Sequence, residues 1–91
     1  MPISPDATLI DLRPEALRAA QPLGEYFRNP VLAVTLEAIE EGQHSLARVP
    51  GPLLVICERG VRSGLAARYL RADGLDADHV PGGVAALMSK S

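Results

Sequence analysis

The sequence of 91 residues has one cysteine, no tryptophan and only three aromatic residues, two tyrosines and a phenylalanine. A single cysteine excludes an internal disulfide, which is typical of a reducing compartment, and we expect a cytoplasmic protein. Nucleic-acid binding has no support, because no basic stripe with interleaved aromatic residues is present. One cysteine and two scattered histidines do not make a metal ligand set. We therefore expect no metal, no cofactor, and surface positions for His44 and His79.

Long apolar runs and strong net charge are also missing. No run is long enough to cross a membrane, and residues 1–5 (Met-Pro-Ile-Ser-Pro) lack the charged and apolar regions of a signal peptide, so we expect no membrane association. The net charge is −2 without a charged block, and 47% of the residues are apolar. Residues 1–91 are therefore expected to form one soluble globular domain, near the small end for independent stability.

What is present is centred on residues 53–74. Leu53–Ile56 is an unbroken apolar run with two β-branched residues, typical of a strand buried on both faces. From Ser63 to Asp73 the apolar residues follow helical spacing, and Gly74 supplies a stop. Between them, Cys57 to Arg62 is expected to be a six-residue loop. The only cysteine thus lies at the carboxyl edge of a sheet, where open α/β folds bind ligands.

The rest of the chain alternates strand and helix patterns. Thr35 is an expected N-cap, and the loop of residues 23–30 is expected to bury Tyr26 and Phe27 beneath it. The alternation predicts an α/β fold with a small parallel sheet covered by helices on both faces. Its order of strands cannot be read from the periodicity. The further expected strands are Thr8–Leu12, Val31–Val34 and Asp76–Val80, and the further expected helices are Glu15–Ala20, Leu36–Glu41, Gln43–Val49 and Val84–Met88.

The position of Cys57 predicts a reactive thiol. The first turn of a helix has unpaired N–H groups and a partial positive charge, and Arg59 and Arg62 add to it. Such surroundings lower a cysteine pKa from about 8.5 to roughly 3.5–7.5. Gly60 lets successive N–H groups point at one centre, an anion-binding nest. The alternative is that Cys57 merely ends a core strand as a small apolar residue; the two arginines and the glycine favour the reactive thiol.

Residues 57–63 (Cys-Glu-Arg-Gly-Val-Arg-Ser), followed by Ala66-Ala67, Leu70 and Gly74, resemble the signature of rhodanese-like domains. Residues 9–13 (Leu-Ile-Asp-Leu-Arg) resemble that family's early strand, and residues 80–83 (Val-Pro-Gly-Gly) resemble its final turn. The resemblance spans about residues 8 to 88. It implies the rhodanese fold and a sulfurtransferase. Sulfur would pass from a donor such as thiosulfate, through a Cys57 persulfide, to cyanide or a thiol, including the thiol of a partner protein.

The resemblance also implies roles for single residues. Arg59 would contact the anionic end of the donor, and Arg62 would hold the loop or add charge. The remaining residues of the loop would surround the substrate, and one of them, Glu58, would disfavour anionic donors because of its negative charge. Asp11 and Arg13 are expected to be structural, bracing the adjacent loop. The remaining loop residues are Glu58, Gly60, Val61 and Ser63.

Two other functions compete with sulfur transfer. Phosphatases and arsenate reductases built on a related loop need an arginine at the sixth position after the cysteine, where this chain has Ser63, and such a reductase needs a second cysteine. A non-catalytic rhodanese-like binding module stays open. The chain departs from the family pattern at three places. Only seven residues precede Thr8, so we expect the helix that is common before the first strand to be missing. Residues 27–33 do not match the family's His-x-Pro-Gly-Ala-like segment, and Leu87 stands where tryptophan is usual. These departures predict a minimal domain with an open pocket and an exposed thiol.

Overall fold

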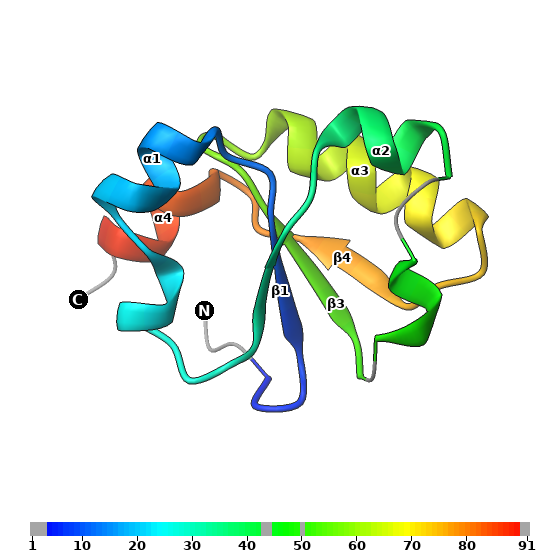
Figure 1. The fold of residues 1–91 in the computed structure, drawn as a ribbon, viewed down its shortest axis with the longest axis horizontal. Coiled ribbons are helices and arrows are strands. Elements are labelled where there is room, and N and C mark those ends of the chain that lie inside the picture. Colours follow the sequence, from blue (N-terminus) through cyan, green and yellow to red (C-terminus); the bar gives the residue numbers. More distant parts are fainter. Residues whose placement is uncertain (1–3, 43–44, 50, 90–91) are drawn as a thin grey trace.

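The computed structural model describes residues 4–42, 45–49 and 51–89. Its centre is a four-stranded sheet with the strand order β2-β1-β3-β4, in which all neighbours run parallel (Figure 1). Asp11 pairs with Ala33 on one side and with Ile56 on the other, so the carboxyl ends of the three strands lie at one edge. The strands are β1 (Thr8–Asp11), β2 (Val31–Ala33), β3 (Leu53–Ile56) and β4 (Ala77–His79).

Helices cover both faces of this sheet. One face carries α1 (Glu15–Ala20) and α4 (Gly83–Ser89), and the opposite face carries α2 (Leu36–Glu40) and α3 (Val61–Ala72) (Figure 1). Two short 3₁₀ turns, η1 (Leu23–Glu25) and η2 (Leu46–Arg48), lie in the connections. The predicted α/β fold, a small parallel sheet with helices on both faces, is confirmed.

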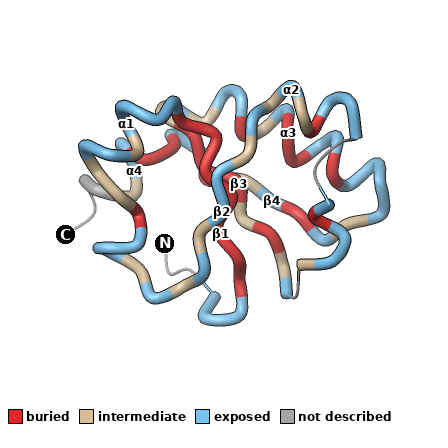
Figure 2. Tube along the Cα trace, viewed as in Figure 1, coloured by how far each residue is buried: buried red, intermediate tan, exposed pale blue. Residues whose placement is uncertain are grey.

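Each face of the sheet has its own apolar core, because successive strand residues point to opposite sides. Ile10 and Val55 belong to the core under α2 and α3, whereas Leu9 and Ile56 belong to the core under α1 and α4. Figure 2 shows the buried residues concentrated in the two inner strands and on the helix faces that meet them. The unbroken apolar run of β3 thus serves both cores, as its sequence predicts.

Most predicted elements are confirmed, and three details are wrong. Thr35 caps α2, since its hydroxyl accepts a hydrogen bond of 3.1 Å from the N–H of Ala38. Tyr26 is not buried beneath its loop but is 54% exposed, while Phe27 packs on the core under α1 and α4. Within the expected helix over residues 43–49, only the η2 turn is found; Gln43 and His44 lie outside the described residues. Finally, α3 begins at Val61, two residues before the expected start.

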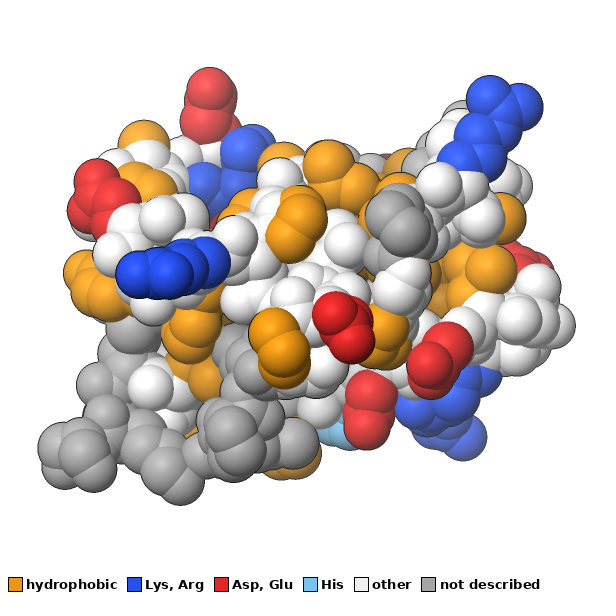
Figure 3. Space-filling model, turned by 90° about the horizontal axis from the view of Figure 1, so that it is seen from below, with side chains coloured by type: hydrophobic (Ala, Val, Ile, Leu, Met, Phe, Trp, Pro, Cys, Tyr) orange, Lys and Arg blue, Asp and Glu red, His pale blue; other side chains and the backbone are white. Residues whose placement is uncertain are grey.

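The surface has no large region of one charge sign on the face seen in Figure 3, where basic and acidic side chains are interspersed with apolar ones. Within residues 4–42, 45–49 and 51–89, no helix has the length and apolar content that crossing a bilayer requires.

Candidate active site

The early start of α3 shapes the loop that holds Cys57. Only residues 57–60 separate β3 from the helix, so the six-residue loop expected from the sequence is too long by two residues. Gly60 occupies the N-cap position with a φ of 90°, a left-handed conformation that favours glycine. This turn directs the N–H of Gly60 at the sulfur of Cys57, with a distance of 3.0 Å between N and Sγ. The expected curling of the loop at Gly60 is therefore present.

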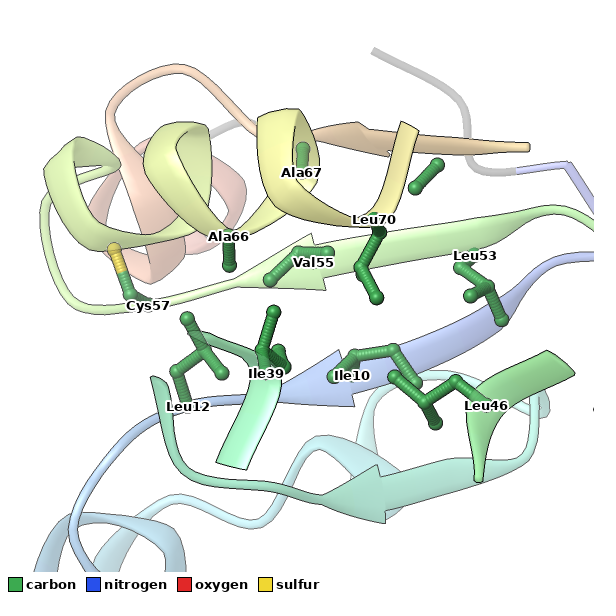
Figure 4. Packing of buried hydrophobic residues seen from close by; sticks show 11 residues of the cluster. Ile10, Leu12, Ile39, Leu46, Leu53, Val55, Cys57, Ala66, Ala67 and Leu70 are labelled. Atoms are coloured by element: carbon green, nitrogen blue, oxygen red, sulfur yellow. The ribbon is translucent and has the colours of Figure 1, made fainter. Parts of the chain in front are cut away.

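Ser63, in the first turn of α3, supplies two further contacts to the sulfur. Its backbone N–H donates to Sγ over 3.4 Å, and its hydroxyl oxygen lies 3.4 Å from the same atom. Figure 4 shows the sulfur pointing at this first helical turn. Ser63 is fully buried, and Cys57 is only 3% exposed. The expectation of an exposed thiol is therefore wrong, because the helix start and the strand ends enclose the sulfur.

These contacts control the acidity of the thiol. Burial raises the pKa of the Cys57 thiol, since a thiolate is poorly solvated inside the protein. Hydrogen bonds from the Ser63 hydroxyl and from the N–H groups of Ser63, Gly60 and Arg59 lower that pKa by more than burial raises it. The net result is a pKa below the ordinary value for cysteine. The predicted activation of Cys57 thus has a structural basis in hydrogen-bond donors that converge on one atom.

A pocket of about 260 Å³ opens beside the sulfur and is lined by Cys57, Glu58, Arg59, Val61 and Arg62. Within it, the guanidinium of Arg62 and the carboxylate of Glu58 form an ion pair of 3.1 Å, and both side chains are about half exposed. Arg59 is exposed and has no ion pair within the described part of the chain. One positive charge in the pocket is therefore balanced and one is free to meet an anion.

The turn after β4 supports the loop from behind, a role that the sequence analysis missed. The N–H of Val84 donates to the carbonyl oxygen of Cys57 over 2.8 Å, and the N–H of Gly83 donates to Val80 over 2.9 Å. A Cβ on Gly83 would collide with the carbonyl oxygen of Cys57 and with the backbone of Glu58. The adjacent glycines Gly82 and Gly83 were the available signal, since paired glycines indicate close backbone approach.

Asp11 and Arg13 form a buried ion pair at the carboxyl end of β1. The Arg13 Nη2 atom lies 2.9 Å from Asp11 Oδ2 and 2.8 Å from the carbonyl oxygen of Gln21, to which it donates. The loop that the pair braces is thus the connection from β1 through α1. The N–H of Leu12 donates to Ile56 over 2.9 Å, which joins this connection to the strand that carries the cysteine.

A second pocket, also missed from the sequence, lies at the carboxyl ends of β1 and β2. It measures about 410 Å³, and Arg13, Arg18, Thr35 and Arg62 are among its lining residues. Because Arg62 also lines the pocket beside Cys57, the two hollows adjoin. The sequence carried no signal for this pocket, since it depends on which strands are neighbours.

Of the two histidines, the structure describes only His79, which lines neither of these pockets. His79 is half-buried, whereas a surface position was expected. Its ring packs against Gly64 of α3, so closely that a Cβ on this glycine would lie 3.4 Å from Nε2 of the ring. Its Nδ1 atom is buried without a hydrogen-bond partner in the described structure. His44 lies outside the described residues. Among the residues that the structure describes, no three His, Cys, Asp or Glu side chains come together to hold a metal ion.

Comparison with known proteins gives matches among solved structures alone, since no protein-family model and no curated protein matches the sequence. A rhodanese homologue from Thermus thermophilus is 37% identical, with a TM-score of 0.67, over 87% of this chain and 80% of that one. A rhodanese-related protein from Thermoplasma volcanium is 23% identical, with a TM-score of 0.75, over 94% and 80%. A protein of unknown function from Rhodopseudomonas palustris, described as a possible tyrosine phosphatase, is 20% identical, with a TM-score of 0.71, over 92% and 67%. The last two likenesses concern the fold alone.

Proposed function

The chain belongs to the rhodanese family, and from this premise we propose that it is a sulfurtransferase that carries sulfur as a persulfide on Cys57. The observation that carries the proposal is the set of donors around Sγ, with N–H groups at 3.0 Å from Gly60 and 3.4 Å from Ser63. Such donors favour the thiolate, which is the nucleophilic form of cysteine. The donor substrate would be a small sulfane-sulfur compound such as thiosulfate.

In the first half-reaction, the Cys57 thiolate attacks the outer sulfur of thiosulfate. A sulfur–sulfur bond to Cys57 forms while the sulfur–sulfur bond of thiosulfate breaks, and sulfite leaves with the electron pair. Arg59, an exposed residue that lines the pocket, would contact the anionic sulfonate end of the donor. The N–H groups of the loop are fixed before the reaction, so they can stabilise the persulfide without reorganisation.

In the second half-reaction, cyanide or a thiolate attacks the terminal sulfur of the persulfide. The bond to that sulfur breaks, Cys57 leaves as a thiolate, and the acceptor departs as thiocyanate or as a new persulfide. Arg62 and Glu58 flank the path to the sulfur. The reaction uses no cofactor and needs a thiol that stays reduced between turnovers, which suits the reducing cytoplasm that we propose as its compartment.

The test is the intact mass of the protein after incubation with thiosulfate, for the wild type and for Cys57→Ala. We expect the wild type to gain one sulfur atom that is lost on reduction, and the alanine variant to gain none. Turnover with cyanide then measures the complete cycle. If neither thiosulfate nor an organic persulfide adds sulfur to Cys57, the proposal is wrong, and the non-catalytic binding module becomes the leading hypothesis.

Phosphate-ester hydrolysis is disfavoured by the same loop. The residue at the sixth position after Cys57 is Ser63, whose N–H and hydroxyl both lie against the sulfur itself. The arginine at the fifth position, Arg62, already belongs to the helix and is paired with Glu58. Donors that converge on the cysteine sulfur favour its thiolate, whereas a phosphoryl group needs donors arranged around its three oxygens.

A further inference from the structure

An exposed apolar stripe runs along the outer face of α3, starting at the active site. It consists of Val61, Leu65 and Tyr69, which are 79%, 41% and 38% exposed and make up three of the six large apolar side chains exposed in the described residues. Their spacing of four places them one above another on a helix, over a length of about 12 Å. We call these three residues the α3 stripe.

Packing inside the domain does not account for the α3 stripe. The helix buries its opposite face, through Ser63, Ala66, Ala67 and Leu70, against the sheet. A helix at the surface of a single domain normally has polar residues on its outer face, and single exposed apolar residues are scattered rather than aligned. Val61, the most exposed of the three, also lines the pocket beside Cys57. The stripe is therefore continuous with the mouth of the active site.

Positive charges predominate beside the stripe, and the acidic Asp73 follows only at its far end, as the C-cap of α3. Arg68 projects from the same outer part of α3, and Arg59 stands at the end nearest Cys57. Neither forms an ion pair within residues 4–42, 45–49 and 51–89, whereas Arg62 is balanced by Glu58. This local excess contrasts with the net charge of −2 for the whole chain. It complements an acidic partner, and it disfavours a second copy of this chain, whose arginines would face these.

Building on the proposed sulfur transfer, we propose that the α3 stripe docks a sulfur-accepting protein whose reactive thiol lies beside apolar and acidic side chains. The partner's thiolate attacks the terminal sulfur of the Cys57 persulfide. The bond between that sulfur and Sγ breaks, its electron pair returns to Cys57 as thiolate, and the partner leaves as a persulfide. The step involves no net oxidation and no further reactant. Docking on α3 brings the thiol to the mouth of the pocket at Val61.

The probe is a synthetic helical peptide with a terminal cysteine and with leucine and glutamate on one face. A matched peptide has lysine in place of each glutamate, and dithiothreitol serves as an acceptor without a docking surface. After the protein is loaded with sulfur, we expect faster transfer to the acidic peptide than to the lysine peptide. The Arg68→Glu variant should lose about tenfold in kcat/KM for the acidic peptide and little for dithiothreitol. Arg28→Glu, the same charge change in the segment before β2, should leave both rates unchanged.

Binding is measured separately, by fluorescence anisotropy of the labelled acidic peptide with serine in place of its cysteine. We expect Arg68→Glu and the double variant Leu65→Ser with Tyr69→Ser each to weaken this binding. Equal binding of the acidic and lysine peptides, or no loss in these variants, would overturn the docking proposal. If no sulfur reaches dithiothreitol, the sulfurtransferase proposal fails, and the anisotropy still decides on the surface. A dimer in sedimentation that the double variant disperses would assign the stripe to a second copy and overturn the proposal as well.

Discussion

The sulfur of Cys57 receives hydrogen bonds from the backbone N–H groups of Gly60 and Ser63, which mutation of side chains leaves in place. One side-chain group, the Ser63 hydroxyl, lies 3.4 Å from the sulfur, accepts from the thiol and can donate to the thiolate. Among the groups that lower the pKa of the thiol, the Ser63 hydroxyl makes the largest contribution. The sequence predicts that this cysteine is reactive, because a glycine and two arginines follow it within five residues. That a buried serine six residues later contacts the sulfur could not be predicted, because it depends on where the helix begins.

We expect Ser63→Ala to raise the pKa of Cys57. The pKa is depressed in the folded protein, so the thiolate is present above that pKa and is lost as the pH falls through it. Without the hydroxyl donor, the midpoint should move to higher pH. The rate of alkylation by iodoacetamide as a function of pH measures this midpoint. Ser4→Ala, at an exposed position, should leave it unchanged, and an unshifted midpoint in Ser63→Ala would contradict the assignment.

Glu58 is expected to act against anionic donors. It lines the pocket of Cys57 and neutralises Arg62, so Glu58→Gln removes a negative charge and frees a positive one. A unit charge about 7 Å from a dianion in water contributes roughly 1 kcal/mol, so we expect kcat/KM for thiosulfate to rise about fivefold. Steady-state kinetics at low and high salt measure this gain, which should shrink as salt screens the charges.

An uncharged organic persulfide is the matched control donor for that experiment, and its kcat/KM should hardly change. A lower rate with thiosulfate in Glu58→Gln would mean instead that the ion pair positions Arg62 for the donor. The sequence shows an acid beside the nucleophile, but only the structure shows that it is paired with the arginine four residues later.

At the scale of elements, the sequence located every strand and most helices but not the start of α3. Helical spacing of the apolar residues is apparent only from Ser63 onward, so the sequence predicts a loop that extends to Arg62. The structure has no side-chain cap at this end; Gly60 in a left-handed conformation takes the N-cap position, and the helix begins at Val61. The N–H groups that a cap would have satisfied are thereby left to bind the sulfur.

The turn that carries Gly83 should be as important for activity as the loop that it supports. Gly83 has a φ of 65°, and a Cβ there would meet the carbonyl oxygen of Cys57. Gly83→Ala should therefore lose about 1–2 kcal/mol of stability from the left-handed conformation and a further 1–3 kcal/mol, roughly, from overpacking. Displacement of the loop should lower kcat/KM on the order of 10²-fold.

Gly74→Ala is the matched control for the cost of placing alanine in a left-handed backbone conformation. Gly74 also has a positive φ, of 86°, but has open space around the position of a Cβ. This variant should lose only about 1–2 kcal/mol of stability while its kcat/KM stays at the wild-type value. Urea unfolding and sulfur-transfer kinetics on both variants provide the test. Equal effects of the two substitutions on activity would show that contact between the turn and the loop is unimportant.

For the whole molecule, the alternation of strands and helices was enough to predict the class of fold but not the order of strands. Hydrophobic periodicity tells which residues are buried, and Leu9 and Ile10 are both buried as expected. It does not tell which strand lies beside β1. The chain places β2 on one side of β1 and β3 on the other, so the connections leave to opposite faces. The pocket at the ends of β1 and β2 arises from that arrangement, which is why it was missed.

The two cores share β1 and β3, and we expect them to unfold together as a single cooperative unit. The absence of tryptophan allows this to be measured with tyrosine fluorescence. Tyr26 follows η1 near the core under α1 and α4, and Tyr69 lies on α3. Tyr69→Phe and Tyr26→Phe each leave one tyrosine as a probe, and their urea transitions should coincide with each other and with circular dichroism.

Adding Leu70→Ala to each single-tyrosine variant tests whether the two faces are coupled. Leu70 is fully buried under α3, and truncating such a leucine costs about 2–5 kcal/mol. Because both sides of the sheet are joined through the same two strands, the Tyr26 signal should move to lower urea by as much as the Tyr69 signal. A Tyr26 transition that stays in place while the Tyr69 transition moves would show that the faces unfold separately. The loop of Cys57, which contacts α3 on one side and the first turn of α4 on the other, would then lose one support before the other.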